Sequence, residues 1–439
     1  MHLPPDATLL PIASGQLLVS REHAVFCGVP AAHVTTVRSV LGGAPLSTLD
    51  ATVVADLERH GFFGEPRPAE EDSPSIQLQL TNRCNLACTY CCTNSGQPRS
   101  SEVTFEQMCR VVDQAREVLG PAGRMAMLGG EPFLVPWAMD LARRIVDRGH
   151  DLTLFTNGTL HGSEALARDT ADLTRRGAQV RVSLAGATAA LCDGASAGPR
   201  FDAAIEGIQH IARFGGKVVV DLMVMPGQVE QLAAGLHGLR RRLPPDTPVA
   251  LGILYLSGRE TGQHLFASRA ELEQALTTIA FDAGELIEAP RTAPLTWRRE
   301  GCGCAMGNHL HVRSDGRLFN CFKMEEHVGD LAQQDFVETA RQVRARPHPA
   351  RALAACADCA LATLCGGGCR SDNLLYTGDA DLPPCGPWRV RLMSELLAEE
   401  RVTAVDWPVH HLLAEAHARG IDAPSHIEPV RQSRHLLET

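Results

Sequence analysis

Short apolar runs alternate with amphipathic stretches through the middle of the chain, between residues 75 and 255. The runs that we predict as strands are SIQLQLT, RMAMLGG, DLTLFTN, AQVRVSL, KVVVDLMVM and VALGILY. The stretches between them, such as TFEQMCRVVDQAREVL and PWAMDLARRIVDRG, carry apolar residues at helical spacing. Six such repeats predict parallel strands with crossover helices, which is an α/β fold built as a partial (β/α)6 barrel. Its functional face would be at the carboxyl ends of the strands.

The segments on either side have different patterns. Residues 1–68 show short apolar alternations and then helical spacing, which predicts two or three small strands followed by helices. The Pro-, Gly- and acid-rich stretch that includes 69–74 predicts a linker, so that the barrel would occupy 75–290. Residues 291–390 contain eight cysteines, Gly-rich spacers and little periodic structure, and bound metal would supply much of their folding energy. Helical patterning returns in 391–439.

The composition narrows the class of protein. Hydrophobic residues make up 44% of the chain and charged residues 21%, with a mean hydropathy of -0.07, as in soluble globular proteins. Because the chain has no apolar run near the ~20 residues of a membrane span and no secretory signal, we expect no membrane partner and a cytoplasmic location. A net charge of -10 argues against a nucleic-acid partner. Fifteen cysteines in a cytoplasmic chain indicate metal ligation rather than disulfides.

Three cysteines follow the first predicted strand directly. In LTNRCNLACTYCC, Cys84, Cys88 and Cys91 have the spacing CxxxCxxC. A loop at the end of a barrel strand lets three thiolates converge on one [4Fe–4S] cluster, and three ligands leave one iron open for a cofactor. The alternative is a set of unrelated buried cysteines. Their place after a strand favours the cluster.

With Tyr90 before its last cysteine, this motif resembles the CxxxCxΦC motif (Φ, aromatic) of the radical S-adenosylmethionine (SAM) superfamily. The resemblance implies a partial (β/α)6 TIM barrel whose open iron chelates the amino and carboxylate groups of the methionine part of SAM. An electron from a flavodoxin- or ferredoxin-type donor would then cleave SAM to methionine and a 5′-deoxyadenosyl radical. That radical would remove a hydrogen from the substrate.

Further resemblances follow in the order of the barrel strands. LGGEP is similar to the family's GGEP motif, which holds the methionine ammonium, and comprises Gly129, Gly130, Glu131 and Pro132. A carboxylate suits a cation physically. The resemblance also implies cofactor contacts by Asn157 in TNGT and Ser183 in VSLAG.

One position departs from the family pattern. After the fourth strand many relatives carry His-Asp and, three residues later, an Arg that contacts the cofactor carboxylate. Here the chain reads LCDGASAGPR, which keeps Asp193 but has Ser196 in place of the Arg. Arg200 is the candidate replacement.

A second cysteine pattern lies in the C-terminal part: Cys304, eleven residues, Gly316, four residues and Cys321, then Cys356, Cys359, Cys365 and Cys369 in Cx2Cx5Cx3C spacing, with Cys385 beyond. This pattern resembles the SPASM (twitch-type) extension of radical SAM enzymes that act on peptides and proteins. The resemblance implies two auxiliary [4Fe–4S] clusters. The nearer one would be ligated by Cys304, Cys321 and Cys369, with Cys302 as a candidate fourth ligand. The outer one would be ligated by Cys356, Cys359, Cys365 and Cys385. If Cys302 does not reach, one iron stays open for substrate; a zinc ribbon is the alternative to both clusters.

The N-terminal segment is similar to a RiPP recognition element, the winged-helix-like module that binds the leader of a ribosomally synthesised precursor peptide. It has that module's order of small strands and then helices, ending in Gly61 and Phe62. The implied partner is a precursor peptide, bound by strand addition to a sheet edge. A stabilising α+β domain without a ligand is the alternative.

Together these resemblances predict a radical SAM peptide maturase that makes a crosslink or a backbone alteration. Formylglycine formation of the sulfatase-maturating type and peptide splicing are alternatives within this class. A non-catalytic iron–sulfur redox sensor and a zinc-stabilised scaffold are alternatives from other classes. The sequence identifies no catalytic acid or base: Tyr255, Asp221 and Glu260 lie near predicted strand ends but are as easily structural.

Overall fold

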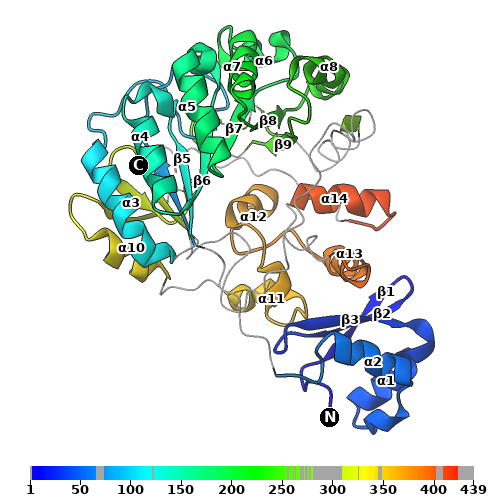
Figure 1. Cartoon of the computed structure of the whole chain (residues 1–439). Helices are drawn as coiled ribbons and strands as arrows, with labels where there is room; N and C mark the ends of the chain where they lie inside the picture. Colours follow the sequence, from blue (N-terminus) through cyan, green and yellow to red (C-terminus); the bar gives the residue numbers. More distant parts are fainter. Residues whose placement is uncertain are drawn as a thin grey trace. The chain divides into compact units, whose positions relative to one another are not determined.

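The computed structural model describes residues 2–65, 74–120, 123–254, 257–260, 262, 264–266, 271, 275, 278–279, 309–324, 326–344, 349–401 and 409–423. The chain divides into two compact units (Figure 1). The N-terminal unit comprises Met1–Asp72, Pro290–Ala305 and Pro347–Glu428. The barrel unit comprises Ser73–Ala289, Met306–Arg346 and Pro429–Thr439.

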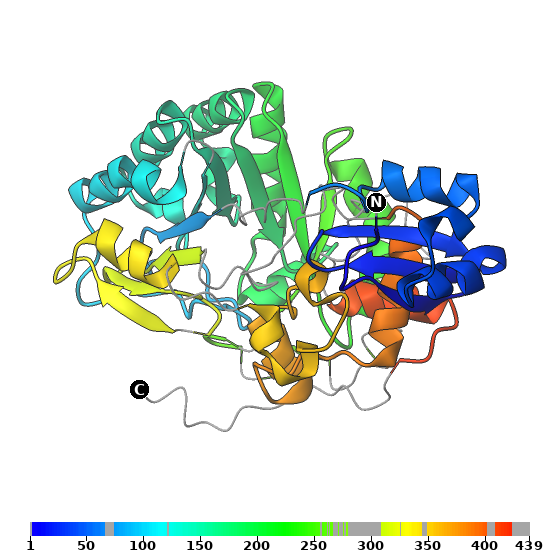
Figure 2. The ribbon, with the colours of Figure 1, turned by 90° about the horizontal axis from the view of Figure 1, so that it is seen from below.

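The barrel unit contains the six parallel strands expected from the sequence. They are β4 (Ser75–Gln79), β5 (Arg124–Leu128), β6 (Asp151–Thr156), β7 (Gln179–Leu184), β8 (Val218–Val224) and β9 (Val249–Ile253), and neighbours in the chain are neighbours in the sheet. The helices are α3 (Phe105–Leu119), α4 (Ala138–Asp147), α5 (Glu164–Arg175), α6 (Ala189–Ser196), α7 (Phe201–Arg213) and α8 (Val229–Arg242). They cover the outer face of the curved sheet (Figure 2). The α/β partial barrel is therefore confirmed.

Alternation along each strand separates the two faces of this sheet. In β4, Ile76 and Leu78 are fully buried, while Gln77 and Gln79 occupy the opposite face. Helix α3 starts at a capping box formed by Thr104 and Gln107, which satisfies N–H groups of its first turn. The apolar side of the sheet therefore packs on helices, and the polar side lines the interior of the barrel.

Three further strands extend the sheet beyond β4. Strand β10 (His309–Val312) pairs in parallel with β4, and β11 (Arg317–Phe319) and β12 (His327–Asp330) continue the sheet in antiparallel pairing. Helix α10 (Phe336–Arg344) packs beside α3, where the Arg344 guanidinium donates to the Val118 carbonyl at 2.7 Å. The sequence after residue 291 shows little periodic pattern, because strands of three or four residues are too short to produce one.

The N-terminal unit contains a three-stranded antiparallel sheet, β1 (Thr8–Ile12), β2 (Gly15–Ser20) and β3 (Val25–Pro30), in that order. Helices α1 (Val34–Leu41) and α2 (Ala51–Arg59) follow it in the chain. Short 3-10 turns lie at Ala31–His33 and Leu46–Thr48. The expected strands and helices are thus present in the expected order.

Both faces of this small sheet are covered. Leu18 and Cys27 pack in a cluster with Val37 of α1 and Leu57 of α2. The opposite face packs on α11 (Ala362–Cys365) and α13 (Pro387–Ala398) through a cluster that contains Leu17, Val19, Leu361, Leu364, Met393 and Leu397. The first 65 residues therefore share a core with the cysteine-rich segment of the same unit.

Two more helices, α12 (Arg370–Thr377) and α14 (Val409–Ala418), complete the described part of the N-terminal unit. Among all described helices of the chain, none combines the length and the apolar character that crossing a membrane requires.

Candidate functional site

The loop that follows β4, residues 80–98, carries the first three cysteines, and we call it the thiol loop. Burial, together with the smaller effects of the charges of Glu131, Cys88 and Cys91, raises the pKa of the Cys84 thiol to about 11. This coupling places the three thiols near one another. The Cys84 sulfur accepts the Leu86 N–H at 3.4 Å, and the Cys91 sulfur accepts the Ser95 N–H at 3.3 Å. Such donors stabilise a thiolate.

Residues just beyond β9 hold the backbone of the thiol loop. Arg259 donates from its guanidinium to the Cys88 carbonyl at 2.6 Å and from its backbone N–H to the Cys91 carbonyl at 2.8 Å. The Ser257 hydroxyl donates to the Cys92 carbonyl at 3.0 Å. Gly258 has φ +64°, and a Cβ there would lie 2.5 Å from the Cys91 carbonyl oxygen. Sequence reasoning missed these residues because a lone Ser-Gly-Arg tripeptide carries no signal of its partner.

The Gly-Gly pair at the end of β5 lies against the thiol loop. Gly130 donates its N–H to the Thr81 carbonyl at 2.8 Å, and Glu131 donates its N–H to the Arg83 carbonyl at 2.9 Å. A Cβ at position 130 would lie 2.2 Å from the Arg83 oxygen and 2.8 Å from the Cβ of Cys84. Only glycine allows this close approach.

The Glu131 carboxylate is fully buried at the same place, at the start of the 3-10 turn Pro132–Leu134. It accepts the Asn157 N–H at 2.8 Å, the Thr156 hydroxyl at 2.9 Å and the Phe133 N–H at 3.3 Å. Burial raises its pKa to about 7, against the lowering effect of these hydrogen bonds. Its protonation would therefore change near neutral pH, and a bound cation would favour the ionised form.

Asn157 lies beside this carboxylate, but its side chain is engaged locally. Its Nδ2 donates to Asn85 Oδ1 of the thiol loop at 2.9 Å, and its Oδ1 accepts the Thr159 hydroxyl at 2.6 Å. The amide thereby joins the end of β6 to the thiol loop.

Arg200 lies at the start of α7 and is only 3% exposed. The Asp193 carboxylate fixes its position by accepting the backbone N–H groups of Arg200 and Phe201, at 2.8 and 2.9 Å. The guanidinium donates to the carbonyl of Ser183 on β7, and its Nε has no partner among the described residues. Its positive charge is one of the influences that lower the pKa of Glu131.

Tyr90 lies near the Arg200 guanidinium, whereas the Ser196 side chain is bonded within its own helix. Burial raises the pKa of the Tyr90 hydroxyl, and the charge of Arg200 lowers it, which places Tyr90 near the guanidinium. The Ser196 hydroxyl instead donates to the Cys192 carbonyl at 2.7 Å within α6. Ser196, which stands where the family has an Arg, therefore has no free hydrogen-bond donor for the cofactor carboxylate.

The acidic residues near strand ends have local partners. Asp221 on β8 accepts Arg181 Nε at 2.9 Å, and Glu260 Oε1 accepts the Gly262 N–H at 2.7 Å. Tyr255 lies outside the described residues.

A second group of thiols lies in the N-terminal unit. Burial, together with the smaller effects of the charges of Cys385, Cys365 and Cys359, raises the pKa of Cys356 to about 12. The structure thus brings together the four cysteines expected at the outer cluster. Cys369 lies in the same unit, at the start of α12.

The expected nearer cluster is described only in part. Cys321 lies in the barrel unit, after β11. Cys302 and Cys304 lie outside the described residues. In the described ranges no three His, Cys, Asp or Glu side chains converge as ligands of a single metal ion. Each thiol of a [4Fe–4S] cluster binds a different iron, so these thiols are spaced more widely than the ligands of a single ion.

A match to a protein family identifies the domain that contains the thiol loop, Glu131 and Arg200. The Radical SAM superfamily matches residues 78–234, which include the thiol loop, Glu131 and Arg200. The chain contains a radical SAM domain. This family implies a [4Fe–4S] cluster and SAM as cofactors, and an enzyme that cleaves SAM.

Relatives of the radical SAM domain carry out different reactions. GTP 3',8-cyclase of Edwardsiella ictaluri is 26% identical over 294 residues, which cover 61% of this chain and 86% of the cyclase. AdoMet-dependent heme synthase of Oleidesulfovibrio alaskensis is 23% identical over 360 residues, 74% of this chain and 91% of the synthase.

A solved structure shows the same fold over most of the chain. SuiB of Streptococcus suis bound to S-adenosylmethionine superposes with a TM-score of 0.54 at 14% identity, covering 88% of this chain and 99% of SuiB. SuiB has also been solved bound to the precursor peptide SuiA, with a TM-score of 0.51.

Proposed function

We propose that this radical SAM enzyme modifies a ribosomally synthesised precursor peptide, by a crosslink or a backbone alteration. The observation that carries the proposal is the N-terminal unit, in which a small three-stranded sheet shares a core with a cysteine-rich segment. A group of four mutually coupled thiols lies in the same segment. SuiB, which has the same fold, binds a precursor peptide.

In the barrel, Cys84, Cys88 and Cys91 would hold the cluster, which supplies the electron for cleaving SAM when it is bound. The chemistry of the donors around them fits that cofactor. Glu131 offers a buried carboxylate for the methionine ammonium, and Arg200 offers a buried guanidinium for the methionine carboxylate. Arg200 thereby takes the role for which Ser196 has no suitable group. Gly129, Gly130 and Pro132 shape the turn that brings Glu131 to the thiol loop.

In the N-terminal unit, Cys356, Cys359, Cys365 and Cys385 would hold the outer auxiliary cluster. Cys304, Cys321 and Cys369 would hold the nearer one, with Cys302 as a candidate fourth ligand. Both sets rest on the SPASM-like spacing and, for the outer one, on the coupling of the four thiols. Electrons would come from a flavodoxin- or ferredoxin-type donor.

The leader of the precursor would add a strand to β3. The Ala31 N–H donates to the Ser14 carbonyl, and hydrogen-bonded pairs alternate in an antiparallel ladder. The N–H groups of Phe26 and Gly28 therefore point away from β2, towards the edge of β3 that pairs with no other strand in the described residues. The outer edge of β1 is less suited, because Pro11 has no N–H to donate.

Two other radical SAM reactions on polypeptides are alternatives to this proposal. Formylglycine formation and peptide splicing also act on polypeptides and differ in the product. A small-molecule substrate, as the name of the cyclase indicates for that relative, would need neither a leader-binding sheet nor its open edge.

The test is anaerobic reconstitution followed by two measurements. Three clusters predict about twelve irons per chain, and the SAM-dependent formation of 5′-deoxyadenosine reports cleavage. We expect replacement of Cys84, Cys88 and Cys91 by Ala to abolish cleavage and remove about four irons. Replacing Cys356 and Cys359 by Ala is the matched control: it should remove a similar amount of iron but leave cleavage detectable.

Other outcomes would point to another function. A fully loaded, reduced protein that forms no 5′-deoxyadenosine would support the redox sensor, and anaerobic protein that contains zinc and little iron would support the scaffold. The substrate is tested by searching the genes beside this one for a short precursor peptide and incubating it with the enzyme: a change in its mass that depends on SAM and on the leader supports the maturase.

A further inference from the structure

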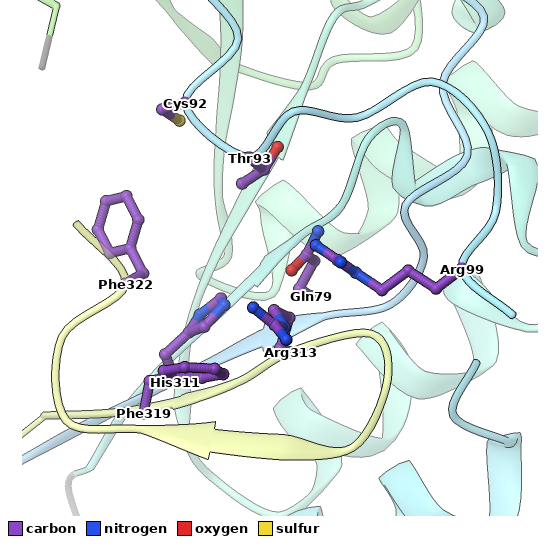
Figure 3. Close-up of a pocket in the computed structure, with 8 residues that line it drawn as sticks. All are labelled: Gln79, Cys92, Thr93, Arg99, His311, Arg313, Phe319 and Phe322. Atoms are coloured by element: carbon purple, nitrogen blue, oxygen red, sulfur yellow. The ribbon is translucent and has the colours of Figure 1, made fainter. Parts of the chain in front are cut away.

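A polar pocket inside the barrel unit belongs to none of the groups assigned above. It lies where β4, β10 and the thiol loop meet, and its empty space, including its open mouth, is about 290 Å³ (Figure 3). The lining residues are Gln79, Cys92, Thr93, Arg99, His311, Arg313, Phe319 and Phe322. Because Cys92 and Thr93 follow Cys91 directly, the pocket lies next to the proposed cluster.

The register of the sheet brings its polar residues together. His311 is the Cα partner of Gln77, and Val312 is the partner of Leu78. Since side chains alternate along a strand, Gln79 and Arg313 continue on the same face as Gln77 and His311. Arg99 directly follows the thiol loop, and in Figure 3 its side chain extends towards Gln79 and Arg313.

Two buried nitrogens in this pocket have no partner. Gln79 is 1% exposed and His311 is 3% exposed, and neither Gln79 Nε2 nor His311 Nδ1 has a hydrogen bond within the described part of the chain. Leaving a buried polar atom unpaired costs about 1–3 kcal/mol, and native structures contain few of them. A group that accepts from Gln79 Nε2, and from His311 Nδ1 in the tautomer that carries its proton there, would remove that cost.

The charge of the pocket indicates the sign of that group. The lining includes two guanidiniums and no carboxylate. Arg313 is held in place by Asp315, which accepts its Nη2 at 2.8 Å, and by the Phe319 ring, whose centroid lies 4.6 Å away. Burial, together with the smaller effects of the charges of His309, Arg313 and Arg99, lowers the pKa of His311 to about 3. His311 is therefore neutral, and the electrostatic potential around it is positive.

We propose that this pocket binds one carboxylate of the peptide substrate, an Asp or Glu side chain or a C-terminus, and so fixes the residue to be modified beside the cluster. The inference rests on the proposed function and adds the requirement for an acidic group. A planar carboxylate suits the guanidinium of Arg99 and the amide of Gln79 as donors. Because Asp315 offsets one of the two positive charges, a single negative charge fits better than a polyphosphate.

The test uses reconstituted protein with SAM and two small probes. N-acetyl-aspartate N-methylamide carries the carboxylate, and N-acetyl-asparagine N-methylamide is its neutral isostere. By ligand-observed NMR we expect the aspartate probe to bind with a Kd of about 1 mM and the asparagine probe at least about tenfold more weakly. Arg99→Gln and Gln79→Leu should each reduce this preference. Arg110→Gln, at an exposed position of α3, is the matched control and should keep it.

The outcomes separate this inference from the proposed function. Wild-type protein that cleaves SAM but binds both probes equally overturns the carboxylate site alone. Equal loss of binding in Arg99→Gln and Arg110→Gln also overturns it, because the effect would then be one of net charge. Tighter, Arg99-dependent binding of GTP than of the aspartate probe would overturn both, since it would identify a nucleotide substrate.

Discussion

The backbone N–H of Asn157 donates to the buried carboxylate of Glu131 at 2.8 Å, and this hydrogen bond joins the carboxyl ends of β5 and β6. It belongs to the backbone and not to the amide side chain, which contacts Asn85 instead. Glu131 is thus fixed by its neighbours before any ligand binds. A preorganised, buried carboxylate of this kind binds a cation more strongly than an exposed one would.

The affinity for SAM should therefore depend on pH through Glu131. Because its pKa is about 7, the carboxylate becomes protonated as the pH falls below 7, and affinity should fall by up to about tenfold per pH unit. Glu131→Gln should bind SAM weakly and without this pH dependence. Equilibrium dialysis of labelled SAM from pH 6 to 8.5 measures both. An unchanged pH profile in the variant would contradict the assignment.

The same pKa predicts the stability of the cofactor-free protein. A carboxyl group whose folded pKa is raised from 4.5 to about 7 stabilises the fold below pH 4.5, and this contribution is lost as the pH rises through 7. Relative to Glu131→Gln, the wild type should lose up to about 3 kcal/mol of unfolding free energy between pH 5 and 8. Urea unfolding of both proteins across this range measures the difference.

Arg200 should make the protein bind SAM in preference to an analogue that lacks the carboxylate. We expect wild-type protein to bind SAM at least about tenfold more tightly than decarboxylated SAM, since a buried guanidinium without its anion is unfavourable. Arg200→Met should lose this preference, and Arg200→Lys should keep part of it because the charge remains. Calorimetric titrations of both ligands give the result. Retention of the full preference in Arg200→Met would show that another group binds the carboxylate.

Gly130→Ala should displace the thiol loop. The added Cβ would lie 2.2 Å from the Arg83 carbonyl oxygen, and relieving this clash costs about 1–3 kcal/mol. Iron content after reconstitution should fall together with thermal stability. Gly194→Ala is the control, because a Cβ there meets no atom within 4 Å and α6 should gain stability. Full iron incorporation by Gly130→Ala would mean that the loop adapts.

Gly28→Pro should weaken leader binding by removing an N–H from the open edge of β3. Its partner Leu17 lies in a pair without hydrogen bonds, so the β2–β3 ladder stays intact. Gly28→Ala is the control, because its Cβ would meet the Cβ of Ala398 at an ordinary 3.7 Å. Fluorescence anisotropy of a labelled leader should show reduced affinity for the Pro variant only. Deleting residues 1–65 is less informative, because it would expose Leu17 and the core it shares with α13.

The periodic parts of the chain could be predicted well. The six apolar runs became β4 to β9, because a strand buried against helices needs a continuous apolar face that is visible in the sequence. Strand β10 was missed, since its four residues pair with β4 across more than two hundred positions of chain. The partner of Ser196 in α6 could not be predicted either. The sequence shows that Ser196 replaces the expected Arg, but not that its hydroxyl donates to the Cys192 carbonyl.

By itself, the sequence determined the chemistry: the spacing of Cys84, Cys88 and Cys91 and the place of Glu131 after a strand are local features that the chain order preserves. Only the tertiary structure decided which distant groups meet. It brought Arg259 to the backbone of Cys88, Arg200 to the carbonyl of Ser183, and Arg99 and His311 to the lining of one pocket. These contacts depend on the curvature and register of the sheet, which arise from packing across the whole barrel and leave no pattern in any single segment.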